Sequence, residues 1–281
     1  MGPVALEDDS STHRDVTSQE KLPGGEQALH SDSIDRVIDV DDGAVWRARL
    51  EELRRQINGH PGAVARLGWD EVRRTYQVFL GNFADLRALL VRASTDMELA
   101  IELVKNVPPF DVREKFQATL DRFIHNYVAA TKSLVDHTRR LTQRYGGSPF
   151  AVEYEQRKKL VAAAGATAFV NDLRNFVLHR ALPLTGHTVR FQRDPIEEFE
   201  SQAYLQTRSL LEWDGWSSKA KDYLAARGET VDLSAAIEDH MQLVRALYDW
   251  LFAQFGELHR VDIDEVNKLV NLYNEVLQGR A

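Results

Sequence analysis

Apolar residues recur every three or four positions through most of the chain, which is the spacing of one face of an α-helix. Glycine and proline pairs separate these periodic segments, as at Asn58-Gly59, Pro108-Pro109 and Gly146-Gly147. The pattern predicts helices at 45–57, 69–105, 112–145, 150–180, 217–227, 233–255 and 262–278. The second of these is either one long helix or a broken pair.

The helical spacing fails between residues 184 and 211. Residues 188–192 and 203–211 are instead two candidate strands of a β-hairpin, because apolar and polar residues alternate there. The predicted fold class is therefore mostly α, with one small β-hairpin near 188–211.

Local signals refine the helix ends. Asp111 has the position of an N-cap, and Glu114 completes the spacing of a capping box. Ser148 followed by Pro149 predicts the start of the helix over 150–180. The small residues at 161–168 in that helix allow another helix to approach closely. An intrachain contact is favoured there over a seam between two copies.

Residues 1–42 combine Ser, Thr, Gly, Pro and acidic residues with few large apolar ones, so we expect a disordered tail. Its eleven acidic and three basic residues account for the whole net charge of −8. The remainder is neutral, and no strongly basic surface indicates nucleic acid. The tail is a solvating segment or, alternatively, one that binds a partner or inhibits the protein.

Two domain divisions are compatible with this pattern. The first joins all the helices in one bundle. The second, which we prefer, has the acidic tail at 1–42, an N-terminal helical segment at 43–107, and a helical core with C-terminal helices at 108–281.

Composition excludes several classes of protein. The chain has no cysteine, which excludes disulfides, thiolate catalysis and Cys-ligated metals and suits a reducing compartment. No apolar run reaches the roughly 18–20 residues of a membrane span, and no signal peptide is evident, so a cytoplasmic protein is expected. The chain lacks the patterns His-Glu-x-x-His and Gly-x-Ser-x-Gly and any glycine-rich phosphate loop. We therefore predict neither a metal nor a cofactor.

One polar cluster stands at the end of the helix predicted over 150–180. Asp172, Asn175 and His179 follow one another at spacings of three and four, so they share a face of the helix. Arg174 lies to the side of that face, and its long stem can bring the guanidinium toward it. An imidazole trades protons near neutral pH, and a guanidinium prefers phosphate. This pair suits metal-independent cleavage of RNA.

The run Arg174-Asn175-Phe176-Val177-Leu178-His179 resembles the R-x4–6-H signature of the HEPN superfamily, in the form with a polar residue after the arginine. The resemblance covers residues 109–183 and, less clearly, the helices up to residue 255. It implies a helical bundle acting as a metal-independent endoribonuclease, in a toxin or defence setting. Arg174 and His179 would be the catalytic pair, with Asn175 and Asp172 orienting the phosphate. HEPN proteins generally dimerise with their motif helices facing across one cleft, so RNA and a second copy are the implied partners.

Other occurrences of the short pattern are chance matches. Arg54 and Arg55 reach His60, and Arg180 reaches His187, but these stretches span Gly or Pro turns. Only in the run that begins at Arg174 is the arginine followed directly by a suitable polar residue within an uninterrupted predicted helix.

The same residues have a structural interpretation. Arg174, Asn175 and His179 near a helix end can cap carbonyls, complement the helix dipole and pair with Asp172. The alternative function is a non-catalytic helical interaction protein, or one that binds a nucleotide or phosphate passively.

Histidines and aromatic residues elsewhere are expected to be structural. His125 and His137 fit ordinary partly buried histidines better than a second base. The runs 213–216 and 248–250 fit turn and core residues, with a base-stacking platform as the alternative.

Overall fold

The computed structural model describes residues 40–192 and 198–279. The chain divides into two compact units, Met1–Ala44 and Val45–Ala281, and the fold below is that of the second. Residues 1–39 of the predicted disordered tail lie outside the described residues. Residues 40–42 already belong to a helix, α1 (Val40–Gly59), so the tail was predicted three residues too long.

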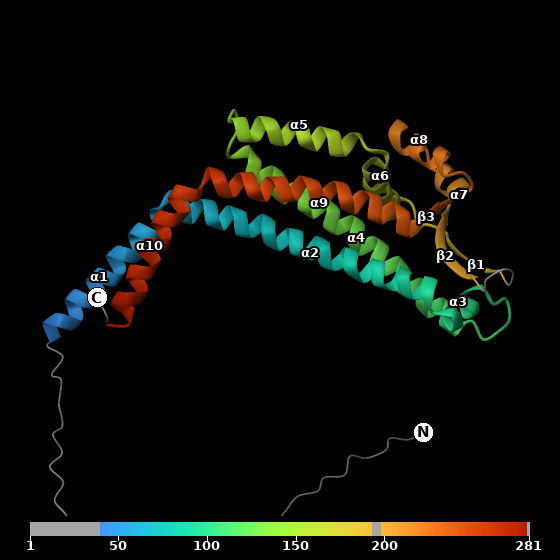
Figure 1. The fold of residues 1–281 in the computed structure, drawn as a ribbon, viewed down its shortest axis with the longest axis horizontal. Helices are drawn as coiled ribbons and strands as arrows, with labels where there is room; N and C mark the ends of the chain where they lie inside the picture. The colour runs from blue at the N-terminus through green and yellow to red at the C-terminus, as the bar shows by residue number, and fades with distance from the viewer. Residues whose placement is uncertain (1–39, 193–197, 280–281) are drawn as a thin grey trace, which may run out of the picture. The chain divides into compact units, whose positions relative to one another are not determined.

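The described residues are mostly helical, which confirms the predicted fold class (Figure 1). None of these helices combines the length and the apolar composition that a membrane span requires. After α1 the helices are α2 (Pro61–Thr95), α3 (Met97–Val104), α4 (Asp111–Gln143), α5 (Pro149–Ala163), α6 (Gly165–His179), α7 (Thr207–Leu211), α8 (Ser218–Ala226), α9 (Leu233–Leu258) and α10 (Arg260–Leu277).

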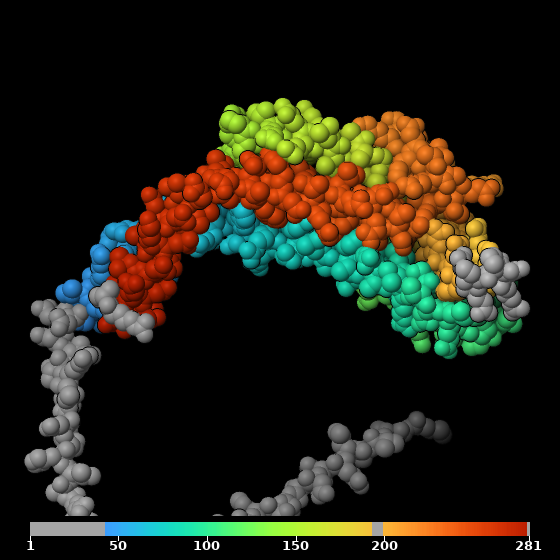
Figure 2. All heavy atoms as spheres, in the orientation of Figure 1, coloured from blue at the N-terminus to red at the C-terminus, as the bar shows by residue number. Residues whose placement is uncertain are grey.

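Three long helices, α2, α4 and α9, pack along one another and contain much of the core. In the space-filling view, side chains fill the space between the ribbons of α2 and α9 (Figure 2). The predicted apolar stripe of α2 is buried as a whole: Val72, Tyr76, Phe79, Phe83, Leu86 and Leu90. Each large apolar side chain removed from water in this way contributes about 1.5–3 kcal/mol.

Polar side chains inside this core are paired across helices. The Tyr127 hydroxyl on α4 lies 2.6 Å from His240 Nδ1 on α9. The Tyr248 hydroxyl lies 2.7 Å from Thr138 Oγ1, which also donates to the carbonyl of Leu134. These bonds satisfy groups that would be costly to bury alone. Burial lowers the pKa of His240 to about 4, so its imidazole is neutral.

The predicted hairpin is confirmed, with different bounds. Strands β1 (Thr185–Gln192) and β2 (Glu198–Gln206) pair antiparallel, with Thr185 opposite Leu205. The end of the predicted second strand is helical instead and forms α7. A third strand, β3 (Thr230–Asp232), pairs with β2 and was not predicted, because three residues are too few for an alternating pattern.

The predicted helix over 150–180 is wrong in one respect: it breaks at Ala164, whose ψ of 137° is extended. The break separates α5 from α6. A Cβ built on Gly165 would lie 3.0 Å from the Tyr223 ring, so the small residues there allow α8 to approach. This is the intrachain contact that the sequence favoured.

The two predicted helix starts have different outcomes. Ser148 caps α5 and accepts a hydrogen bond from the amide of Ala151, 3.2 Å away, as expected. The predicted capping box at Asp111 is wrong. Helix α4 includes Asp111, and Phe110 occupies the cap position without a side-chain bond.

Segments on both sides of the domain boundary predicted at residue 107 pack in one unit. Helix α2 lies along α4, and the C-terminal helix α10 returns to the start of α2. This last contact requires glycine, because a Cβ on Gly62 would lie 2.1 Å from the carbonyl oxygen of Asp262.

The buried His240 predicts a pH dependence of stability. The unfolded chain binds a proton at this side chain below pH of about 6.5, whereas the folded protein does so only near pH 4. Stability should therefore fall from pH 6.5 to pH 4 by roughly 3 kcal/mol through this group. The variant His240→Gln, which keeps a hydrogen-bonding side chain, should lose that part of the slope in urea unfolding measured across this range.

The exposed His125 on α4 provides the matched control, and His125→Gln should retain the wild-type slope. Parallel stability curves for wild type and His240→Gln would contradict the assignment.

Candidate functional site

Helix α6 carries the predicted motif and is anchored by aromatic packing. Phe169 and Phe176 on its buried face stack on Trp216, at 5.7 and 5.8 Å between ring centroids. The indole of Trp216 donates to the carbonyl of Leu210 at 2.6 Å. Trp216 is therefore the core residue that was expected and cannot serve as a base-stacking platform. The exposed face of α6 is held in a fixed position by this packing.

Asp172 on α6 contacts the start of α8. Its Oδ2 accepts hydrogen bonds from the amide of Ser217 at 2.7 Å and from the hydroxyl of Ser217 at 2.6 Å. Ser217 is itself the N-cap of α8. Asp172 therefore joins two helices and does not pair with Arg174.

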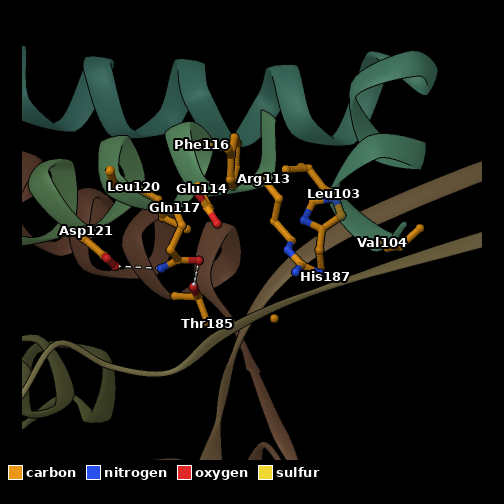
Figure 3. Close-up of a pocket in the computed structure, with 12 residues that line it drawn as sticks. Leu103, Val104, Arg113, Glu114, Phe116, Gln117, Leu120, Asp121, Thr185 and His187 are labelled. Atoms are coloured by element: carbon orange, nitrogen blue, oxygen red, sulfur yellow. Dashed lines mark hydrogen bonds between the residues drawn. The ribbon is translucent and has the colours of Figure 1, made fainter. Parts of the chain in front are cut away.

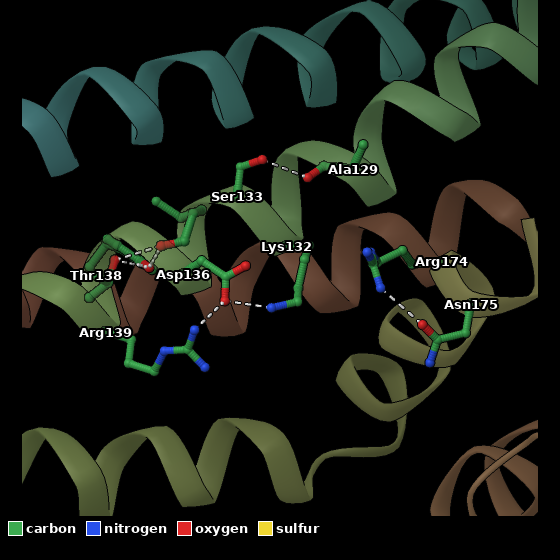
Figure 4. A network of polar contacts seen from close by, with 10 residues as sticks. Ala129, Lys132, Ser133, Asp136, Thr138, Arg139, Arg174 and Asn175 are labelled. Carbon is green, nitrogen blue, oxygen red and sulfur yellow. Dashed lines mark hydrogen bonds and ion pairs between the residues drawn. The ribbon is translucent and has the colours of Figure 1, made fainter. Parts of the chain in front are cut away.

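Arg174 and Asn175 are half-buried and bonded to each other. Arg174 donates from Nη1 to Asn175 Oδ1 at 3.0 Å, and no carboxylate among the described residues forms an ion pair with it. Figure 4 shows this pair together with Lys132, Asp136 and Arg139 of α4, where Asp136 binds both cations of its own helix. These cations lower the pKa of Asp136. The neighbourhood of Arg174 thus contains more cations than carboxylates.

His179 occupies the last turn of α6 and is exposed. Its imidazole forms neither a hydrogen bond nor an ion pair with any residue that the structure describes. Three leucines close to it in sequence are also exposed, with exposed fractions of 41% for Leu178, 50% for Leu182 and 59% for Leu184. The end of α6 and the segment after it therefore expose an unpaired imidazole and three apolar side chains within seven residues of sequence.

Arg174 and His179 do not lie on the same side of α6. Five residues on a helix correspond to a rotation of about 140° around the axis and a rise of about 7.5 Å. The bond to Asn175 holds the guanidinium about one helical turn before His179. Among the described residues, no hydrogen bond joins the Arg174 and His179 side chains.

Three histidines that the sequence singled out, His60, His125 and His137, have structural contacts or none. His137 Nδ1 lies 2.8 Å from the hydroxyl of Thr75 on α2, which agrees with the partly buried histidine that was expected. His125 is exposed, contrary to the same expectation. The chance match His60 caps α2 by accepting from the amide of Gly62.

A cavity lies elsewhere, between the end of α3, the first turns of α4 and the start of β1, and its volume is about 680 Å³. No residue of the α6 motif lines it. Its polar residues Arg113, Gln117 and Asp121 were not predicted from the sequence, although their spacing of four marks one face of α4. Across the residues described, no three His, Asp or Glu side chains are grouped as metal ligands would be.

Comparison with protein-family models, with curated proteins and with solved structures gives no match for this chain. The resemblance to HEPN proteins therefore depends on the motif residues alone.

The contact between Asp172 and Ser217 predicts a structural role for this carboxylate. Asp172→Ala should lower the free energy of unfolding by about 1 kcal/mol, because it removes the acceptor at the start of α8. Asp172→Asn retains an oxygen acceptor and should cost less. Urea unfolding measures both. The exposed neighbour Asp214 has no side-chain contact of this kind, so Asp214→Ala should have almost no effect.

A loss of RNA cleavage in Asp172→Asn without any loss of stability would contradict this role.

Proposed function

We propose that this protein is a metal-independent endoribonuclease of the HEPN type, acting in the cytoplasm, whose active site is completed when two copies bring their α6 helices together. The observation that supports this most is the state of His179. It is exposed, it lies on a helix fixed by its aromatic face, and it is free of the carboxylate partners that usually accompany a structural histidine.

His179 would act as the general base. A neutral imidazole accepts the proton of a ribose 2′-hydroxyl, whose oxygen attacks the adjacent phosphorus. A bond from the 2′-oxygen to phosphorus forms, and the bond to the 5′-oxygen of the next nucleotide breaks. The proton then passes to that leaving oxygen, so the products are a 2′,3′-cyclic phosphate and a free 5′-hydroxyl.

Arg174 would stabilise the charge that develops on the phosphoryl oxygens, since a guanidinium provides several donors in a fixed plane. Asn175 supports this role because its Oδ1 orients the guanidinium. Asp172 would contribute indirectly, by anchoring α6 to α8.

In the proposed dimer, a second copy supplies the catalytic side chain that the first copy does not place at the phosphate. Arg174 is bonded to Asn175 and has no bond to His179, so Arg174 of one copy and His179 of the other would flank the same phosphate. Exposed Leu178, Leu182 and Leu184 supply apolar surface near His179 that a second α6 would cover. The HEPN resemblance implies the same arrangement.

One observation favours the alternative, a protein that binds phosphate or a nucleotide without cleaving RNA. Arg174 already has Asn175 as a partner, and the motif lies outside the cavity formed by α3, α4 and β1. A shallow surface with a preformed cation suits passive binding, so cleavage and binding need separate measurement.

Cleavage should depend on both motif residues. With total RNA and excess EDTA, His179→Ala should reduce the cleavage rate by about 10²- to 10⁴-fold. Arg174→Ala should reduce it by about 10²- to 10³-fold. The exposed residues His125 and Arg54 lie on other helices, and replacing either by Ala should leave the rate unchanged.

Equal cleavage by wild type and both motif variants would exclude the site. Binding of RNA without cleavage by wild type, weakened in Arg174→Ala, would establish the alternative.

Dimerisation should require the apolar surface next to the motif. Leu178→Asp should shift the protein to a monomer in analytical ultracentrifugation and abolish cleavage, because it places a carboxylate in the contact between α6 helices. Leu160→Asp is the control, since Leu160 is 74% exposed on α5.

Mixing the inactive variants Arg174→Ala and His179→Ala tests the shared site. Half of the mixed dimers are heterodimers with one complete site, so activity should return to about a quarter of the wild-type value. No recovery in a mixture that demonstrably exchanges subunits would show that each site takes both residues from one copy.

A further inference from the structure

The cavity between α3, α4 and β1 has the size of a small-molecule site. Its volume of about 680 Å³ lies within the range that holds ligands in proteins. Leu103 and Leu120 are buried in its wall, whereas Glu114 and Val104 are exposed at its rim. Polar and apolar groups both line it (Figure 3).

His187 on β1 presents an acceptor that no protein group uses. Its Nε2 lies 2.6 Å from Ser201 Oγ, and that hydroxyl donates its only proton to the carbonyl of Ala93 at 2.8 Å. Nε2 must therefore carry the proton of the imidazole, which leaves a bare lone pair on Nδ1. Burial lowers the pKa of His187 and keeps the ring neutral. Nδ1 is buried and has no partner among the described residues.

Arg113 provides a cation without a counter-ion at the same end of the cavity (Figure 3). Its guanidinium stacks over the Phe110 ring at 4.5 Å, and Nη1 makes one long bond of 3.4 Å to the carbonyl of Lys105. No carboxylate in the described ranges lies within ion-pair distance of it. Most of its donors are left for a ligand.

Asp121 provides a carboxylate without a cation at the other end (Figure 3). Its Oδ1 accepts from Gln117 Nε2 at 2.8 Å, and Gln117 in turn accepts from the hydroxyl of Thr185 at 2.6 Å. Burial raises the pKa of Asp121, since no positive group offsets the loss of water. Glu114 adds a second carboxylate at the rim.

The two ends are separated by the length of a short ligand. Arg113 and Asp121 are eight residues apart on α4, which corresponds to about 12 Å along the axis. The ring of Phe116 and the side chain of Leu120 lie between them in sequence and line the same wall. One cation against two carboxylates gives the lining a net negative charge, which disfavours a phosphate group.

We propose that this cavity binds the amino-terminal end of a short peptide. The peptide ammonium binds Asp121, and the apolar side chains rest against Phe116 and Leu120. A backbone amide two or three residues further on places its carbonyl at Arg113. Three extended residues span about 10 Å, which matches the separation of the two ends. This site is independent of the function proposed for α6.

Calorimetric titration of the full chain with the tripeptide amide Ala-Leu-Ala-NH₂ and its N-acetylated form tests the proposal. The free amine should bind at least about tenfold more tightly, because acetylation removes the charge that faces Asp121. Uridine monophosphate, the probe for a nucleotide site, should not bind there.

Variants locate the two ends. Asp121→Asn should abolish the difference between free and acetylated peptide, whereas Arg113→Gln should weaken both forms equally. Glu114→Gln at the exposed rim should reduce the preference for the free amine and leave folding intact, since Glu114 has no side-chain partner among the residues described. Asp85→Asn, an exposed site on α2, is the matched control and should bind as wild type does.

Equal affinity for the two peptides, an absence of binding by both, or displacement of the bound peptide by uridine monophosphate would each overturn the proposal. A preference for the free amine that persists in Asp121→Asn would overturn the assigned orientation and with it the proposal.

Discussion

The common core of α2, α4 and α9 is the constraint on which the rest of the structure depends. Each helix buries one apolar stripe in it, and Phe79 and Tyr127 lie at its centre with their rings 5.5 Å apart. The apolar area alone does not fix which turns face one another. The paired polar groups Tyr127 with His240 and Thr138 with Tyr248 do, because a shift by one turn would leave each of them buried without a partner.

The pattern of apolar residues predicted this part of the fold well. The spacing of three and four residues that marks a buried helix face can be recognised within one continuous segment of sequence. The same pattern failed where a contact with residues distant in sequence determines the local secondary structure. The extended backbone at Ala164 precedes Gly165, a poor helix former, and Gly165 packs against Tyr223 on α8, which is distant in sequence. Similarly, β3 exists only because β2 offers it an edge.

The same distinction separates the two candidate sites. The α6 motif could be found from the sequence because its residues lie within eight positions of one helix, yet the partners of Asp172 could not, since Ser217 is distant in the chain. The cavity could not be found at all. Arg113 and Asp121 looked like solvated positions of an amphipathic helix until the start of β1, with His187, covered them. Spacing predicts which side chains share a face but not what that face meets.

The fixed backbone of each site is a consequence of that core. Helix α6 is anchored through Phe169 and Phe176, and the bond to Asn175 holds Arg174 about one turn before His179. The two side chains are not bonded to each other, so under the proposed function another surface completes the site. The cavity on α4 requires no second copy, because α4 supplies both of its charged ends and β1 closes it within one chain. Stiffness therefore has opposite consequences: it leaves the α6 surface incomplete in a single copy, while it keeps the unpaired charges of the cavity apart and available to a ligand.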